Sequence, residues 1–197
     1  MNALLTKFPT KIRIDDIDYE INSDYKNCLK IILAYEDESL MSSEQNYIML
    51  KRLYKIIPEN IEEAIEKGIK FLNCGEEKKN TITDADKRVY SFEKDSKFIY
   101  SAVKQTHDVD LESIEFLHWW KFVFLFMDVN KDCTFSYLIS LRSKKAKGKL
   151  DEYEKKAWFS MREIVDLDYV SPEDEEEDEF FKEWNGDDAD AQLATEH

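Results

Sequence analysis

One stretch of the chain, residues 114–127, consists almost entirely of apolar and aromatic side chains. A helix over these residues has apolar side chains around nearly its whole circumference. In a protein that folds in water, such a helix belongs at the centre of the core, where each fully buried large side chain contributes about 1.5–3 kcal/mol. The longest apolar run, near residues 122–127, is far shorter than the roughly 20 residues that a membrane span needs. We therefore predict a central helix with these structural core residues: Leu117, His118, Trp119, Trp120 and Phe122.

Turn-forming residues are scarce elsewhere in the chain. Only 4 Gly and 3 Pro occur in 197 residues, whereas multi-stranded sandwiches and barrels use many such residues. Apolar side chains recur at helical spacing instead, next to residues that favour helix ends. The expected helices follow Asn22–Asp24, run from Ser42 or Ser43 to Pro58, from Asn60 to Gly75, from Ser91 past Val103, and over residues 114–127, 135–142 and 150–165.

Near the N-terminus, two short segments alternate between polar and apolar residues. Residues 11–14 and 17–21 have this period of two, and Asp15-Asp16 between them can form a turn. A lone hairpin is only marginally stable in water, so it should pack on the helices or join the sheet of a partner. The predicted fold class is therefore mainly α: a compact domain of about six to seven helices with a small N-terminal β-hairpin.

Negative charge is concentrated at the C-terminus. Residues 171–197 hold twelve acids and one base, a net charge of −11, which leaves −4 of the total −15 for residues 1–170. Repulsion among the consecutive carboxylates of residues 173–179 predicts a disordered tail. The charged, non-periodic residues at about 76–88 predict a mobile loop. We expect a single helical domain over residues 1–170 and an acidic tail over 171–197. This charge disfavours binding to nucleic acid, which needs clustered Lys and Arg.

No arrangement of residues in the sequence indicates catalysis or a cofactor. The three histidines are far apart: His107 at a predicted helix end, His118 within the aromatic stretch, and His197 at the terminus. The sequence contains no glycine-rich phosphate loop and no nucleophile elbow. Residues 128–132 resemble the start of a calcium loop, but Cys133 and Ile139 stand where that loop needs Gly and Glu. We therefore expect no enzyme activity, no cofactor and no metal.

The cysteines and the first residues favour an intracellular protein. Cys28, Cys74 and Cys133 are odd in number, widely spaced and without a Cys-x-x-Cys pair, which is typical of reduced, buried cysteines. Residues 1–10 lack the apolar stretch of a signal peptide.

Several segments are similar to blocks of a known family. The segment Tyr-Glu-Ile-Asn-Ser-Asp-Tyr at residues 19–25 resembles its opening block, and the Leu-His-Trp-Trp-Lys-Phe segment at 117–122 resembles its most specific one. Further similar positions are residues 90–95, 99–102, 110–111 and Arg142. The chain thus resembles the bacteriophage "gene product fifteen" family of tailed phages of Gram-positive bacteria, from about Phe8 to Arg142. It departs from the pattern at His107-Asp108, where the family often has Tyr-Gly, and in its acidic tail.

The resemblance implies a tail assembly chaperone, because such proteins are typically encoded between the major tail protein and the tape measure protein. It would bind and solubilise the tape measure protein, yield to subunits of the major tail tube protein, and act in the cytoplasm of the infected host bacterium. It would be absent from the mature virion. No nucleic acid or membrane partner is expected, and self-association stays open.

Two other hypotheses remain. The net charge of −15 permits an acidic inhibitor that mimics nucleic acid and blocks a host defence nuclease, although a mimic needs its acids fixed in a phosphate-like array. The chain is also compatible with a structural tail component that stays in the virion. Copy number in the particle separates this component from a chaperone.

Overall fold

A computed structural model describes residues 3–76 and 88–169 of the chain. The predicted mobile loop at about 76–88 lies outside the described residues except for its two end residues, and the predicted tail at 171–197 lies wholly outside them. The chain divides into two compact units, one over Met1–Ile139 and the other from Ser140 onward, and each is described by itself.

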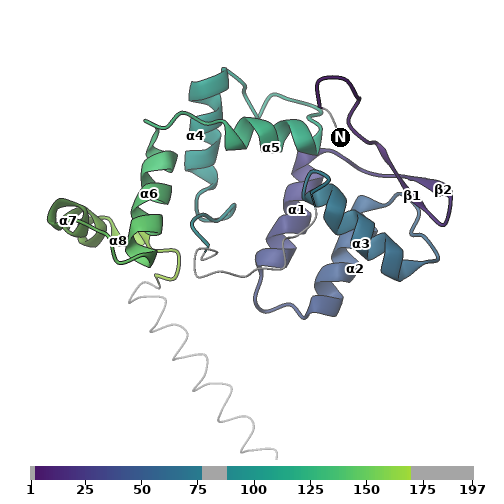
Figure 1. Cartoon of the computed structure of the whole chain (residues 1–197), viewed down its shortest axis with the longest axis horizontal. Helices are drawn as coiled ribbons and strands as arrows, with labels where there is room; N and C mark the ends of the chain where they lie inside the picture. Colours follow the sequence, from purple (N-terminus) through teal and green to yellow (C-terminus); the bar gives the residue numbers. More distant parts are fainter. Residues whose placement is uncertain (1–2, 77–87, 170–197) are drawn as a thin grey trace, which may run out of the picture. The chain divides into compact units, whose positions relative to one another are not determined.

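The predicted hairpin is confirmed. Strands β1 (Lys11–Ile14) and β2 (Ile17–Glu20) pair antiparallel, and the two turn residues between them have positive φ angles, as tight hairpin turns require (Figure 1). The hairpin packs against α3 (Ile61–Leu72). The Lys67 Nζ donates a hydrogen bond of 2.7 Å to the Arg13 carbonyl, so the pair of strands does not stand alone.

Helices α1 (Tyr25–Glu36) and α2 (Ser42–Leu53) pack against each other. Asp24 begins α1, since its Oδ1 accepts from the Lys26 N–H at 3.0 Å. The expected extension of α2 to Pro58 is wrong. The backbone turns away after Leu53 because the Asn22 N–H donates to the Leu53 carbonyl at 2.7 Å, and Tyr54 forms a β-bridge with Ile21.

A side chain caps α3, and another forms a turn before α4. Asn60 caps α3 as expected, accepting from the Glu63 N–H at 3.2 Å, and Gly75 follows its end with a φ of +84°. Helix α4 (Ser96–His107) begins later than expected from Ser91. The Ser91 hydroxyl accepts from the backbone N–H groups two and three residues further along the chain and forms a turn ahead of the helix.

The aromatic stretch is helical only in part. Helix α5 (Trp119–Met127) begins five residues after the predicted start at Ile114, and His118 is its N-cap and not a residue within it. The preceding residues are held extended by α1's entry segment: the Tyr25 N–H donates to the Leu117 carbonyl at 2.8 Å, and the Trp119 N–H donates to the Ser23 carbonyl at 2.7 Å.

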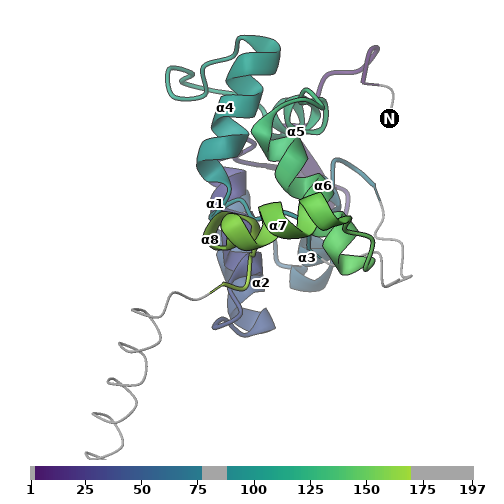
Figure 2. The ribbon, with the colours of Figure 1, turned by 90° about the vertical axis from the view of Figure 1, so that its left-hand side faces the viewer.

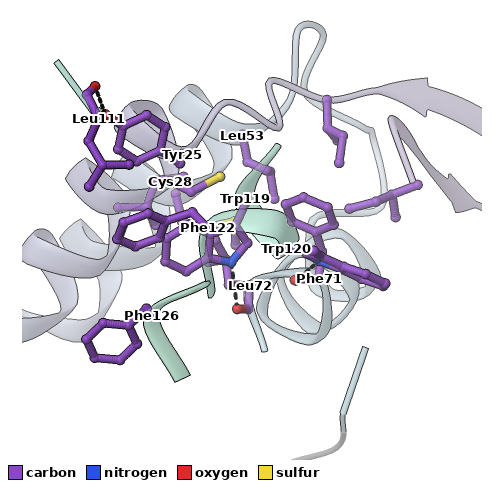
Figure 3. Close-up of a cluster of buried hydrophobic side chains, with 14 of the residues drawn as sticks. Tyr25, Cys28, Leu53, Phe71, Leu72, Leu111, Trp119, Trp120, Phe122 and Phe126 are labelled. Carbon is purple, nitrogen blue, oxygen red and sulfur yellow. Dashed lines mark hydrogen bonds between the residues drawn. The ribbon is translucent and has the colours of Figure 1, made fainter. Parts of the chain in front are cut away.

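The core of the first unit gathers around the buried side of α5 (Figure 3). The indole N–H groups of Trp119 and Trp120 donate to the carbonyls of Leu72 and Phe71, each at 2.8 Å, so the end of α3 is tied to α5. The Tyr25 ring stacks on Phe122 with centroids 5.0 Å apart. Of the five predicted core residues, four are buried and Leu117 is half-buried.

The boundary between the units falls within α6 (Thr134–Ala146), which is longer than the expected 135–142. The helix expected over 150–165 divides at Met161, whose φ is −119°, into α7 (Glu152–Ser160) and α8 (Arg162–Val165) (Figure 2). The buried Arg142 guanidinium donates to the Val165 carbonyl at 2.7 Å and the Ile164 carbonyl at 2.9 Å. The positive charge of this guanidinium stabilises the C-terminal end of α8.

The predicted fold class is confirmed: eight helices and one small hairpin make up the regular structure of the described residues. The count exceeds the expected six to seven because the last predicted helix divides. Within residues 3–76 and 88–169, no helix is both long and apolar enough to cross a membrane.

Candidate partner-binding groove

Helix α5 is not buried around its whole circumference, although Trp120 is buried as well as the core-facing residues. Trp119, Phe122 and Phe126 face the core, whereas Phe124 is 39% exposed and Met127 is 75% exposed. A helix with apolar side chains around its circumference was expected to be central to the core. Part of its apolar surface instead remains at the surface, as is typical of an interaction site.

Part of α5, including the buried Trp119 and Phe126 as well as the exposed Phe124 and Met127, lines a groove with a volume of about 1190 Å³. That volume exceeds the roughly 300–1,000 Å³ of ordinary small-molecule pockets. The groove lies entirely within the first unit and is formed by four segments. Its principal apolar lining residues are Ile32 and Tyr35 of α1, Leu72 and Cys74 at the end of α3, Val89, Tyr90 and Phe92 before α4, and Trp119, Val123, Phe124, Phe126 and Met127 of α5.

The lining chemistry suits burial of an apolar surface. Tyr90 and Phe92 contact each other edge to face at 5.4 Å, and both contact Phe126 at 5.2 Å, so one end of the groove is an aromatic cluster. Met127 is unbranched and flexible, and methionines of this kind adapt to differently shaped partners.

Charged side chains lie around this apolar lining. Three are carboxylates, Glu36, Glu38 and Glu76, and one is the guanidinium of Arg88. Arg88 Nη2 lies 2.6 Å from Glu36 Oε2. Burial raises the pKa of Glu36, and the nearby Arg88 opposes this effect. Glu38 and Glu76 are exposed and pair with no cation among the described residues.

The only cysteine among the groove's lining residues, within the described part of the chain, is Cys74. Burial, together with the charge of Glu76, raises the pKa of this thiol to about 12. It is therefore protonated at neutral pH and a weak nucleophile. No group of three His, Cys, Asp or Glu side chains in the described ranges could hold a metal ion.

His118 has a structural position beside the core. Its Nε2–H donates to the Pro9 carbonyl at 3.0 Å, and its Nδ1 accepts from the Trp120 N–H at 3.1 Å. These two bonds require the neutral ring, and burial lowers the His118 pKa accordingly. The His107 ring, at the end of α4, hydrogen-bonds the Leu125 carbonyl at 2.9 Å, and His197 lies outside the described residues.

No sequence-based expectation located the groove, because the partner-binding residues were left unknown. Of the five residues predicted as core, Trp119 also lines it. The signal in the sequence that could have indicated it was the nearly complete apolar circumference of residues 119–127. One contact with the core does not need apolar side chains on all sides of a helix. Which part of that circumference stays uncovered depends on the three other segments.

These features define a mainly helical protein whose first unit carries an apolar groove bordered by carboxylates. Residues 4–167 match the family described as Bacteriophage Gp15 protein, and the chain belongs to this family. The match extends past the segments that resemble the family in sequence, includes α7 and α8, and ends before the acidic tail. No curated protein and no solved structure matches the chain.

Proposed function

We propose that this phage protein is a tail assembly chaperone, and that its groove covers apolar helix faces of the tape measure protein. The observation that carries the proposal is the apolar groove along α5 in a member of a bacteriophage family. An amphipathic helix that lays its apolar face into a hydrophobic groove is a common mode of peptide recognition. A long helical protein with exposed apolar faces aggregates unless such partners cover it.

The size of the groove supports a helix as its occupant. A helix about 10–12 Å across that rises about 1.5 Å per residue fills roughly 120–170 Å³ per residue. A groove of about 1190 Å³ is therefore comparable in volume to a helix segment of roughly seven to ten residues, or two to three turns.

A site of this size also supports reversible binding. One side of such a helix segment covers on the order of 300 Å², well below the roughly 800 Å² per partner of a stable interface. Each chaperone copy would then bind with moderate affinity and yield to tail tube subunits as the tube polymerises. On this proposal the protein acts in the host cytoplasm, has no catalytic activity, and is absent from the mature virion.

Co-expression with the tape measure protein of the same phage tests the proposal. The tape measure protein should become more soluble and co-purify at both low and high salt, because apolar burial is screened little by ions. Failure to co-purify and to raise solubility would reject the chaperone function. Salt-sensitive capture of a host nuclease would instead support the acidic inhibitor.

Quantitative mass spectrometry of purified virions tests the proposed location. A chaperone should be present at far below one copy per tail ring. Stoichiometric retention would identify a structural tail component.

A further inference from the structure

The charged border of the groove gives it a chemical preference. We propose that the groove selects amphipathic helices whose apolar face is flanked by Lys or Arg side chains, through Glu38 and Glu76. This inference rests on the proposed function, because it specifies which helices the groove accepts.

Among the described lining residues, the border carries more negative charge than positive. Arg88, the one cation among them, lies 2.6 Å from Glu36, and the Ser91 hydroxyl lies 3.5 Å from the same carboxylate oxygen. These contacts compensate the negative charge of Glu36. Glu38, which follows α1, and Glu76, which follows α3, have no cationic partner within the described part of the chain. Two carboxylates from separate segments, neither of them paired with a described cation, therefore border one apolar site.

Charge also argues against occupants from this chain. The tail contains Phe180, Phe181 and Trp184, but residues 171–197 have a net charge of −11 and would be repelled by the groove's border. A second copy would present residues 1–170, whose net charge is −4. A basic amphipathic helix meets both features of the groove, because its apolar face is buried while its flanks pair with the carboxylates.

The preference should be modest and should depend on salt. Exposed ion pairs are individually weak, and screening weakens them further. A helix with flanking lysines would make two attractive pairs with the border carboxylates, and a helix with flanking glutamates would make two repulsive pairs. Together these correspond to about a tenfold difference in affinity at low salt. At high salt both kinds of helix should bind almost equally, because the apolar face provides most of the affinity.

Two fluorescent synthetic peptides of about 18 residues, long enough to form helices, test this preference. They share one leucine stripe and differ only in flanking lysines or glutamates. Titrated with the full chain at low salt and followed by fluorescence anisotropy, the lysine peptide should bind about ten times more tightly.

The acidic tail attracts lysine peptides by itself, so the decisive comparison is between two variants that both keep it. Glu38→Lys with Glu76→Lys reverses the two border charges. Glu112→Lys with Glu115→Lys makes the same change in net charge at exposed positions outside the groove lining. The first variant should lose or invert the preference, and the second should keep most of it.

Equal preference in both variants would overturn the inference, because the selectivity would then come from overall charge. Failure of both peptides to bind would overturn it too, and so would sedimentation of the parent chain as a dimer whose dissociation is needed for peptide binding. Each result is distinguishable from failure of the proposed function, which the co-expression experiment measures without these peptides.

Discussion

His118 makes two hydrogen bonds that only its neutral ring can make together. Nδ1 accepts from the Trp120 N–H and begins α5, while Nε2 donates to the Pro9 carbonyl. A proton on Nδ1 would remove the cap. The neutral ring therefore connects the start of α5 with the segment before the hairpin.

This arrangement predicts a pH dependence of stability. Burial lowers the pKa of folded His118 below the ordinary 6.5, so just below pH 6.5 the unfolded chain binds more protons than the folded one. The contribution of His118 to the free energy of unfolding should therefore fall as pH is lowered from about 7 toward 5. His118→Asn keeps a capping oxygen but cannot titrate, and its urea midpoint should change less over this range. Identical pH profiles would contradict this role of His118.

Trp119 combines burial with a hydrogen bond. Its side chain is 2% exposed, and its indole N–H donates to the Leu72 carbonyl. Trp119→Ala should lower the free energy of unfolding by about 3–5 kcal/mol, as measured by urea denaturation. Met127→Ala on the same helix should change it by no more than about 0.5 kcal/mol. Leu117→Ala should cost less than Trp119→Ala, because Leu117 is half-buried. A Trp119→Ala protein as stable as the parent would refute the core assignment.

At the scale of elements, most local signals, though not the one at Ser91, predicted the observed ends, and non-local signals were not visible in the sequence. The hairpin turn and the caps Asp24 and Asn60 act within a few residues, so the sequence alone predicted them. The start of α5 and the end of α2 depend on backbone pairing with residues far away in sequence. Periodicity extends both helices too far because apolar residues 114–118 and 54–57 fit a helix as well as the observed turns.

Asp24 links two of these elements. Its Oδ1 caps α1, and its Oδ2 accepts from the Leu117 N–H at 3.3 Å. Asp24→Ala should lower the free energy of unfolding by about 0.5–2 kcal/mol or slightly more, because both N–H groups lose their acceptor. Asp24→Asn keeps one acceptor oxygen and should fall between the parent and the alanine variant. Unchanged urea midpoints in both variants would show that the link contributes no stability.

At the scale of the molecule, function depends on surface that the fold leaves uncovered. The family and the helical class could be predicted from motifs in the sequence, such as residues 117–122, and these residues lie at or beside the core. The groove could not be predicted in the same way, because four segments separated in sequence create it. Its border charges, Glu38 and Glu76, looked like ordinary surface acids among the chain's 43 acidic residues.

The most direct test of the chaperone proposal compares two pairs of exposed apolar residues in the co-expression assay. Phe124→Gln with Met127→Gln removes apolar surface from the groove without changing charge. Ile17→Gln with Ile56→Gln does the same outside it, at side chains that are 57% and 75% exposed. The groove variant should retain at least tenfold less tape measure protein, since two large side chains contribute well over 1.4 kcal/mol when fully buried. The control should behave like the parent. Equal retention by both variants would show that the tape measure protein does not bind in this groove.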